Sequence, residues 1–119
     1  MWTYNQANGQ LSRNGVLVSI GYSGLGVGRN NPAEQDVHGT GPIPQGFWQI
    51  GQPMDTPNLG PHVMPLTPAL ETNTFGRGGF FIHGESWEHP GQASHGCIIL
   101  ERPIRQEISD SGDTELEVV

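Results

Sequence analysis

Residues 80–100 read FFIHGESWEHPGQASHGCIIL, a stretch that holds three of the five histidines of the chain and its only cysteine. The apolar run Phe80–Ile82 ends at His83, and a second apolar run, Ile98–Leu100, follows Cys97. Short apolar runs bounded by glycine and proline are typical of buried strands. The stretch therefore predicts two core strands, with a histidine ending one and the cysteine preceding the other.

The residues around the cysteine suit a nucleophile. A thiol must lose its proton before it attacks, and His83, His89 or His95 could take that proton. An active Cys97 is then expected to form its thiolate, and to react with iodoacetamide, at a pH well below ~8.5, the pKa of a free thiol. Gly96 allows a sharp bend, where backbone N–H groups can stabilise an oxyanion. A lone cysteine beside an apolar run is more often a small buried hydrophobe, so a structural role stays open.

Length and composition point to a small β protein. The 119 residues fit one domain, so we treat 1–119 as a single unit. Eighteen glycines and ten prolines leave little room for long helices and favour short strands joined by turns. Most of the large aromatic side chains are expected in the core or on the sheet surface, namely Trp2, Phe47, Trp48, Phe80 and Phe81. His38 and His62 stand in Gly/Pro-rich loops and are expected at the surface.

The charge and cysteine count exclude several classes of protein. Twelve acidic residues against five arginines and no lysine give a net charge of −7, so a nucleic acid or an anionic membrane finds no basic patch. One cysteine excludes an internal disulfide and a four-cysteine zinc site. No apolar run approaches the ~20 residues of a membrane span, and the first residues lack the pattern of an export signal.

Turn signals divide the rest of the chain. Residues 2–23 predict paired strands, because Asn8-Gly9 and Asn14-Gly15 favour tight turns. A Gly/Pro/Asn-rich loop follows over 24–46, and loops of that length are usually functional or disordered. Residues 47–51 predict a short strand and 52–70 an extended segment. Residues 102–112 predict a helix, with Pro103 in its first turn and Gly112 as its stop, and 114–119 predict a final strand.

Several of these motifs resemble a known family. IHG at 82–84 followed by SHGCII at 94–99 is similar to the signature of the L,D-transpeptidase (YkuD-type) catalytic domain, and GPIPQGFWQI at 41–50 to the strand before its site. The chain resembles most closely the small leaderless type VI secretion effectors of this kind, in which GRNNP, PLTP and SGD recur in the same order. The likeness runs from about Trp2 to Val119. It implies a mostly β, sandwich-like L,D-transpeptidase fold with one or two short helices.

The resemblance also implies roles for the matched residues. Cys97 matches the nucleophile that forms a thioacyl-enzyme, and His83 matches its base, with the Gly84 backbone orienting the ring. The backbone amides of Gly96 and Cys97 would form the oxyanion site. Ser94 and His95 match positions that would support the turn before Cys97. A hydroxyl there can hydrogen-bond across the turn and hold its shape.

Substrate contacts are less directly matched. Many members carry Asn or Arg where this chain has Ile99, so another residue must hold a substrate carboxylate. Arg29 is the candidate, since a guanidinium can bind a carboxylate through two parallel bonds; otherwise it is a solvated loop arginine. Trp87 could stack over the substrate or anchor its loop. Glu85 could shape the site or face solvent.

The implied function is modification of peptidoglycan without a cofactor. Cys97 would attack the meso-diaminopimelate carbonyl of a tetrapeptide stem and expel D-alanine. Water as acceptor gives L,D-carboxypeptidase activity, and a D-amino acid or a second stem gives exchange or transpeptidation. The likeness further implies synthesis in the cytoplasm without a signal peptide, delivery by the type VI apparatus to the periplasm of a target bacterium, and a periplasmic immunity protein as partner.

Two other classes of protein stay open. A catalytically inactive module that binds the cell wall or a partner could keep the same fold. A metal-binding protein is the second class, because four side chains of suitable type occur close together in the sequence, although their spacing fits no common zinc pattern. Those four side chains are His83, His89, His95 and Cys97.

Overall fold

The computed structural model describes all 119 residues and contains ten strands, one α-helix and two short 3-10 helices. The helices are α1 (Arg102–Ser111), η1 (Gly26–Gly28) and η2 (Pro32–Glu34). The strands are β1 (Trp2–Tyr4), β2 (Gln10–Arg13), β3 (Val16–Ile20), β4 (Tyr22–Ser23), β5 (Gly46–Ile50), β6 (Met54–Thr56), β7 (Gly60–Pro68), β8 (Phe81–His83), β9 (Ile98–Ile99) and β10 (Glu115–Val118). The predicted mostly β fold is therefore confirmed.

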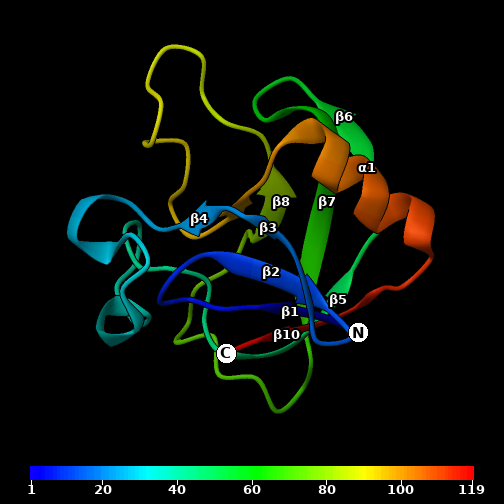
Figure 1. The fold of residues 1–119 in the computed structure, drawn as a ribbon. Helices are drawn as coiled ribbons and strands as arrows, with labels where there is room; N and C mark the ends of the chain where they lie inside the picture. Colours follow the sequence, from blue (N-terminus) through cyan, green and yellow to red (C-terminus); the bar gives the residue numbers. More distant parts are fainter.

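The strands follow one continuous path in the order β3-β2-β1-β10-β5-β7-β8-β9-β4, and β6 pairs with β7 beside it. The long strand β7 connects the two parts of this path, because its last residues pair with β5 and its middle residues with β8. The sheet bends along β7, so that β1, β2 and β10 lie over β7 and β8 (Figure 1). This doubling back gives the sandwich-like arrangement.

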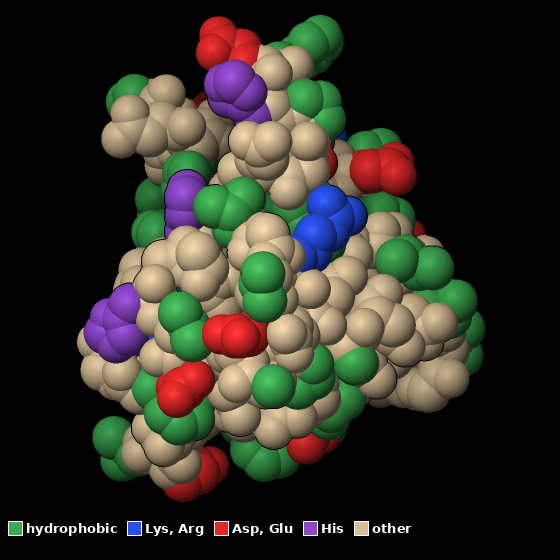
Figure 2. Space-filling model, turned by 90° about the vertical axis from the view of Figure 1, so that its left-hand side faces the viewer, with side chains coloured by type: hydrophobic (Ala, Val, Ile, Leu, Met, Phe, Trp, Pro, Cys, Tyr) green, Lys and Arg blue, Asp and Glu red, His purple; other side chains and the backbone are tan.

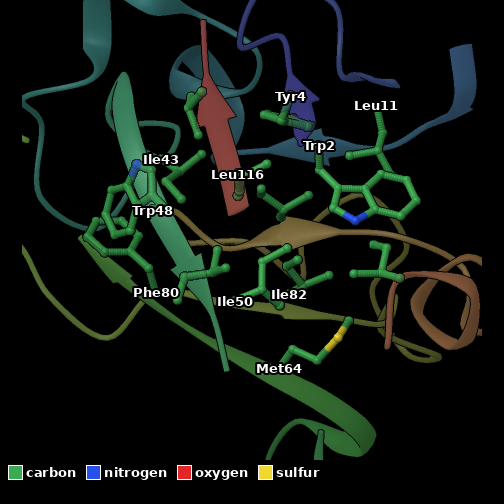
Figure 3. Close-up of a cluster of buried hydrophobic side chains, with 14 of the residues drawn as sticks. Trp2, Tyr4, Leu11, Ile43, Trp48, Ile50, Met64, Phe80, Ile82 and Leu116 are labelled. Atoms are coloured by element: carbon green, nitrogen blue, oxygen red, sulfur yellow. The ribbon is translucent and has the colours of Figure 1, made fainter. Parts of the chain in front are cut away.

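The space between the two parts is filled by fifteen buried apolar residues. Every second residue of a strand points to the same face, so Trp2 and Leu116 reach this core from one part of the sheet. Met64 and Ile82 reach it from the other (Figure 3). Phe47 is exposed because it alternates with buried Trp48 on β5, whereas Phe80 is part of the core as predicted.

The predicted elements at both ends of the chain are present. β1, β2 and β3 form an antiparallel meander, and positive φ angles at Asn14 (51°) and Gly15 (83°) make its second turn. α1 has Pro103 in its first turn and ends at Gly112, whose φ is 71°. The segment 52–70, expected only to be extended, is the β6–β7 hairpin. No helix in the chain has the length and apolarity needed to cross a membrane.

The helix is tied to the sheet by a buried arginine. The guanidinium of Arg105 donates to the carbonyls of Leu100 (2.6 Å), Pro61 (3.1 Å) and His62 (3.0 Å). These carbonyls belong to the residue after β9 and to the start of β7. α1 therefore lies against β7 and β8, next to β6 (Figure 1).

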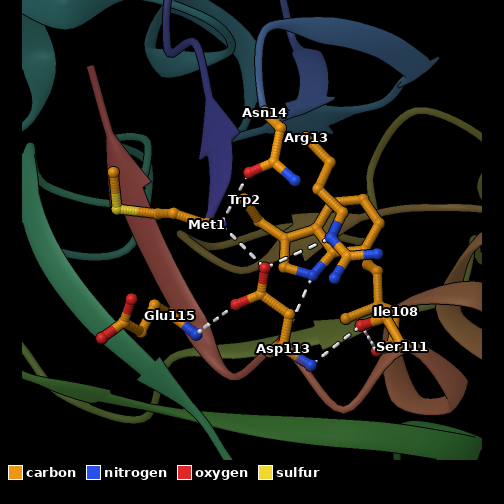
Figure 4. A network of polar contacts seen from close by, with 8 residues as sticks. All are labelled: Met1, Trp2, Arg13, Asn14, Ile108, Ser111, Asp113 and Glu115. Carbon is orange, nitrogen blue, oxygen red and sulfur yellow. Dashed lines mark hydrogen bonds and ion pairs between the residues drawn. The ribbon is translucent and has the colours of Figure 1, made fainter.

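A polar network joins the two ends of the chain at Asp113 (Figure 4). Its Oδ2 lies 2.8 Å from the Met1 amine and accepts from Nε of Arg13 (3.2 Å), and its backbone carbonyl accepts from the Trp2 indole (3.2 Å). β1 runs parallel to β10, directly after this network. The hydrogen bond from the Met1 amine is the first cause that holds the pKa of Asp113 below its usual range.

We expect Asp113→Asn to lower the free energy of unfolding by about 1 kcal/mol, because the contacts to the Met1 amine and to Arg13 lose the carboxylate charge at a partly buried site. The folded pKa is lowered, so this contribution is present above the ordinary Asp pKa of about 4 and disappears as pH falls through the folded value. Urea unfolding at pH 7 and pH 3 measures the difference, which should shrink at pH 3. Glu107→Gln, an exposed change of the same charge on α1, is the control. Equal losses in both variants would contradict this assignment.

Candidate active site

The parallel pairing of β8 and β9 determines where His83 and Cys97 lie. Ile82 stands opposite Ile98 in the register, and both point into the core. Residues next to them in sequence point to the other face of the sheet. His83 and Cys97 therefore share that face, displaced by two residues along adjacent strands, which corresponds to Cα atoms about 8 Å apart.

His83 is held in one tautomer. The side chain is buried, and its Nδ1 lies 2.9 Å from the carbonyl oxygen of Gly84. A carbonyl only accepts hydrogen bonds, so Nδ1 carries the proton and Nε2 keeps its lone pair. Burial lowers the pKa of His83 and Arg105 acts in the same direction, against the hydrogen bond to Gly84. The imidazole is therefore neutral at pH 7, the form that can accept a proton.

Cys97 is half-buried and protonated. Its Sγ donates a long hydrogen bond, 3.7 Å, to the carbonyl oxygen of Gly79, and no hydrogen bond joins it to His83. Burial raises the pKa of the thiol to about 11, although the Phe81 backbone N–H and the Arg77 charge favour the thiolate. The expectation of a thiolate below pH 8.5 is thus wrong for the resting protein, because desolvation outweighs both favourable contacts.

The turn before Cys97 is organised by the buried hydroxyl of Ser94. Its Oγ donates to the carbonyl of Cys97 (2.6 Å) and accepts from the backbone N–H groups of Gly24 (2.9 Å) and Gly96 (3.2 Å). One side chain thus bonds across the turn and also ties it to the loop after β4. Removing such a fully used buried hydroxyl leaves polar backbone groups without partners.

A second serine holds the same turn from the opposite side. Ser23, also fully buried, donates from Oγ to the carbonyl of Gly96 (3.0 Å) and accepts from the backbone of Ile43 (2.9 Å). The sequence predicted that the amides of Gly96 and Cys97 together face an oxyanion. The Gly96 N–H instead serves Ser94, which leaves the Cys97 N–H as the one of the two without an acceptor in the protein.

His95 lies at the junction of two surface depressions. A groove of about 620 Å³ is lined by His83, and a smaller hollow of about 270 Å³ is lined by Cys97; His95 lines both. Its Nδ1 lies 2.9 Å from the carbonyl of Gly39, so Nε2 is uncommitted. Histidine side chains lie toward the left-hand part of the face drawn in Figure 2, and acidic side chains are scattered over the same face.

Two of the three expected substrate contacts have other partners. The guanidinium of Arg29 lies over the Tyr22 ring, 4.0 Å from its centroid, and lines a separate depression rather than the groove or the hollow. Glu85 accepts from the Tyr22 hydroxyl (2.6 Å) and from the Gly91 backbone (3.0 Å). Glu85 therefore shapes the loop between β8 and β9 and lines the groove. Arg29 is exposed, reaches the same loop only through a 3.5 Å hydrogen bond to the Gly91 carbonyl, and lies outside both depressions, so its contact with a substrate carboxylate stays a prediction.

The third expected contact, Trp87, is 99% exposed. It lines the groove, on the loop that projects from the body of the molecule between β8 and β9 (Figure 1). The indole therefore does not anchor the loop, and its role in stacking on a substrate stays a prediction.

Sequence reasoning missed two residues beside the cysteine. Arg77 is buried and donates to four backbone carbonyls, and it lines the hollow together with His38, which was expected only at the surface. Arg77 lies in the irregular segment FGRGG, where no strand or helix period marks a residue as buried. The carbonyls that accept from Arg77 belong to Gln35 (2.6 Å), Pro42 (2.8 Å), Gly41 (2.8 Å) and His95 (3.4 Å).

The metal-binding alternative finds no support in the geometry. The fold brings together no group of three or more His, Cys, Asp or Glu side chains that could hold an ion. His89 lies on the projecting loop and lines the groove, whereas Cys97 lines the hollow. The imidazoles of His83 and His89 thus line the groove and the sulfur of Cys97 lines the hollow, and only His95 lines both.

Comparison with known proteins places this chain in a family. A family model, the Tlde1 domain, matches residues 18–115. An L,D-transpeptidase of Enterococcus faecium, crystallised as a cysteine-to-serine mutant, superimposes with a TM-score of 0.58 and 15% identity over 99% of this chain. An L,D-transpeptidase from Mycobacterium smegmatis superimposes with a TM-score of 0.55 and 17% identity, also over 99%. The chain covers 48% and 57% of those two proteins, about half of their length. No curated protein sequence matches it.

We expect Gly96→Ala to lower the free energy of unfolding by about 1–3 kcal/mol. The φ of Gly96 is 137°, and an added Cβ would lie 2.6 Å from Nη2 of Arg77, which its carbonyl partners hold in place. Gly78→Ala, where an added Cβ meets nothing within 4 Å, is the matched control and should change stability little. Urea denaturation compares the two variants. An unchanged midpoint for Gly96→Ala would show that the close approach to Arg77 is not a constraint.

Proposed function

Because this chain belongs to the Tlde1 domain family of type VI secretion effectors, which is L,D-transpeptidase-like, we propose that it is a cysteine-dependent enzyme acting on the peptidoglycan tetrapeptide stem. The observation that carries the proposal is the placement of Cys97 and His83 on one face of the β8–β9 pair, away from the core. The groove and the hollow that these residues line give a peptide access from outside.

In the proposed acylation step, the thiol of Cys97 turns from Gly79 toward Nε2 of His83. Nε2 takes the thiol proton as the sulfur attacks the carbonyl carbon of the stem, so the S–C bond forms when the charge appears. The hydrogen bond from Nδ1 to Gly84 supports the imidazolium that results. The free N–H of Cys97 then donates to the oxyanion. The C–N bond breaks, and His83 returns the proton to the departing D-alanine amine.

The acceptor decides the product of the second step. Water attacks the thioester, His83 removes its proton, and a tripeptide stem and free thiol result; this is L,D-carboxypeptidase activity. A D-amino acid in place of water gives exchange, and the amine of a second stem gives a cross-link. The exposed loop that carries Trp87 supports water as an acceptor, because it leaves the groove open to solvent.

Family membership supports the proposed setting. As a type VI effector domain, the chain would be delivered into the periplasm of a target bacterium, where peptidoglycan stems are accessible. A producer of such an enzyme needs protection, so we propose a periplasmic immunity protein as its partner.

A second candidate is a module that binds stems without turnover. One observation favours it: the Cys97 thiol has a pKa of about 11 and no hydrogen bond to His83. Such a module would bind muropeptides equally well with and without the sulfur. The next experiment separates the two candidates.

Wild-type protein incubated with tetrapeptide muropeptides is expected to release D-alanine or to exchange it, as followed by mass spectrometry. Cys97→Ala should abolish the product, and His83→Ala should slow it at least about 100-fold, because general-base assistance is lost. Arg102→Gln, an exposed change on α1, should leave the rate unaltered. Circular dichroism checks that each variant is folded. Absence of product from the wild type, or full activity of Cys97→Ala, would remove the enzyme proposal.

The pH dependence tests the protonation states directly. Alkylation of Cys97 by iodoacetamide follows the thiolate fraction, so its rate should keep rising above pH 9, toward the pKa of about 11. Turnover needs only neutral His83 and should fall only below the ordinary histidine pKa of about 6.5, since burial lowers the folded value. A plateau of alkylation below pH 8 would instead indicate a thiolate–imidazolium pair formed before substrate binds.

A further inference from the structure

The hollow beside Cys97 differs in charge from the rest of the molecule. Twelve acidic residues make the chain strongly anionic, yet none of them lines this hollow. Three of its ten lining residues are basic in type, namely His38, Arg77 and His95. The remaining wall is formed by Phe80, Cys97 and glycines. The hollow is therefore a place where an anion avoids the negative field of the protein.

Arg77 is a buried charge without a carboxylate partner. It forms no ion pair, and its two Nη atoms donate only to backbone carbonyls, while its Nε–H makes no hydrogen bond. Asp36 is near enough to favour the charged guanidinium but does not contact it. Buried charges are normally paired, because removing them from water is costly. An anion in the hollow would supply the missing partner.

The two histidines each keep one ring nitrogen uncommitted. His38 donates from Nε2 to the carbonyl of Phe75 (2.9 Å), and His95 donates from Nδ1 to that of Gly39 (2.9 Å). Nδ1 of His38 and Nε2 of His95 are left for a ligand, and each donates to an anion when the ring is an imidazolium with a proton on that nitrogen as well. The glycine wall is open too, since a Cβ added at Gly78 would meet nothing within 4 Å. The hollow thus combines a fixed charge, two imidazoles and space.

We propose that this hollow binds the C-terminal carboxylate of the stem, the carboxylate of the residue that leaves as an amine. The inference rests on the proposed function and specifies its substrate. Only a nitrogen and an α-carbon separate that carboxylate from the carbonyl carbon under attack, a reach of about 4 Å at most. With the carbonyl carbon at the sulfur of Cys97, the carboxylate must lie in the immediate surroundings of Cys97, where the hollow is.

This assignment replaces Arg29 as the carboxylate contact and has a consequence for specificity. A stem whose terminal carboxylate is free can use His38, Arg77 and His95 together. A stem whose terminal carboxyl is amidated, or joined to another stem, loses the charge that the hollow selects. The enzyme is then specific for free stem ends rather than for existing cross-links.

Two small alkylating reagents test the hollow without any peptidoglycan substrate. Iodoacetate carries a carboxylate next to its reactive carbon, and iodoacetamide is its neutral counterpart. Both reagents meet the same thiolate fraction, so the ratio of their rates with Cys97 reports only the preference for the anion. We expect this ratio to exceed that of free cysteine by at least about fivefold.

Variants then locate the preference. His38→Gln and His95→Gln should each lower the iodoacetate to iodoacetamide ratio toward that of free cysteine, and both replace exposed side chains. Arg102→Gln, which removes one positive charge from α1 outside the hollow, should leave the ratio unchanged. A wild-type ratio no higher than that of free cysteine, or a high ratio that both histidine variants retain, would overturn the inference.

A parallel assay separates this inference from the proposed function. Wild-type protein is given tetrapeptide stems with a free or an amidated C-terminus. Faster release from the free stem, together with the raised alkylation ratio, supports both proposals. Equal release from the two stems overturns the carboxylate site and leaves the enzyme standing. Without release from either stem the enzyme proposal fails, and the alkylation ratio alone decides whether the hollow selects carboxylates.

Discussion

The parallel pairing of β8 with β9 is the contact on which the candidate site depends. It is short, with only two residue pairs in register, and the core side chains of Ile82 and Ile98 fix that register. A shift of one residue would turn Cys97 into the core and Ile98 out of it. Such a shift would expose an apolar side chain to water, and this free-energy cost keeps the sulfur of Cys97 in its position. β7 on one side and β4 on the other complete the sheet around this pair.

The bend that precedes β9 is fixed by close contacts rather than by regular structure. The hydroxyls of Ser94 and Ser23 donate hydrogen bonds to backbone carbonyls of the turn. The guanidinium of Arg77 lies so close to Gly96 that a side chain at position 96 would collide with it. Ser94 belongs to the turn itself, whereas Ser23 and Arg77 come from other segments and meet the turn only in the folded chain. Their contacts are buried, so each hydrogen bond is protected from competition by water. The cysteine is therefore presented by a rigid turn, while the loop that carries Trp87 lies outside it.

Local sequence signals predicted much of the fold. The turn dipeptides, the apolar runs at 80–82 and 98–100, and the proline and glycine that bound α1 are all local patterns, and each marks an element that is present. The β6–β7 hairpin was missed because three prolines in β7 obscure a strand pattern, although prolines are tolerated at positions without a ladder bond. His83 and Cys97 could be singled out from residue type and resemblance. The burial of Arg77 and the use of Glu85 by Tyr22 depend on tertiary contacts that leave no periodic trace in the sequence.

The position of β10 between β1 and β5 has a kinetic consequence. The first strand of the chain can find its parallel neighbour only when the last one is available, so the central part of the sheet closes a loop of nearly the whole polypeptide. Pairing between strands so far apart in sequence makes folding slow and all-or-none, because the chain loses conformational entropy before the contacts between the strands stabilise it. If the chain passed through a narrow conduit in extended form, the sheet could therefore assemble only after both β1 and β10 had emerged.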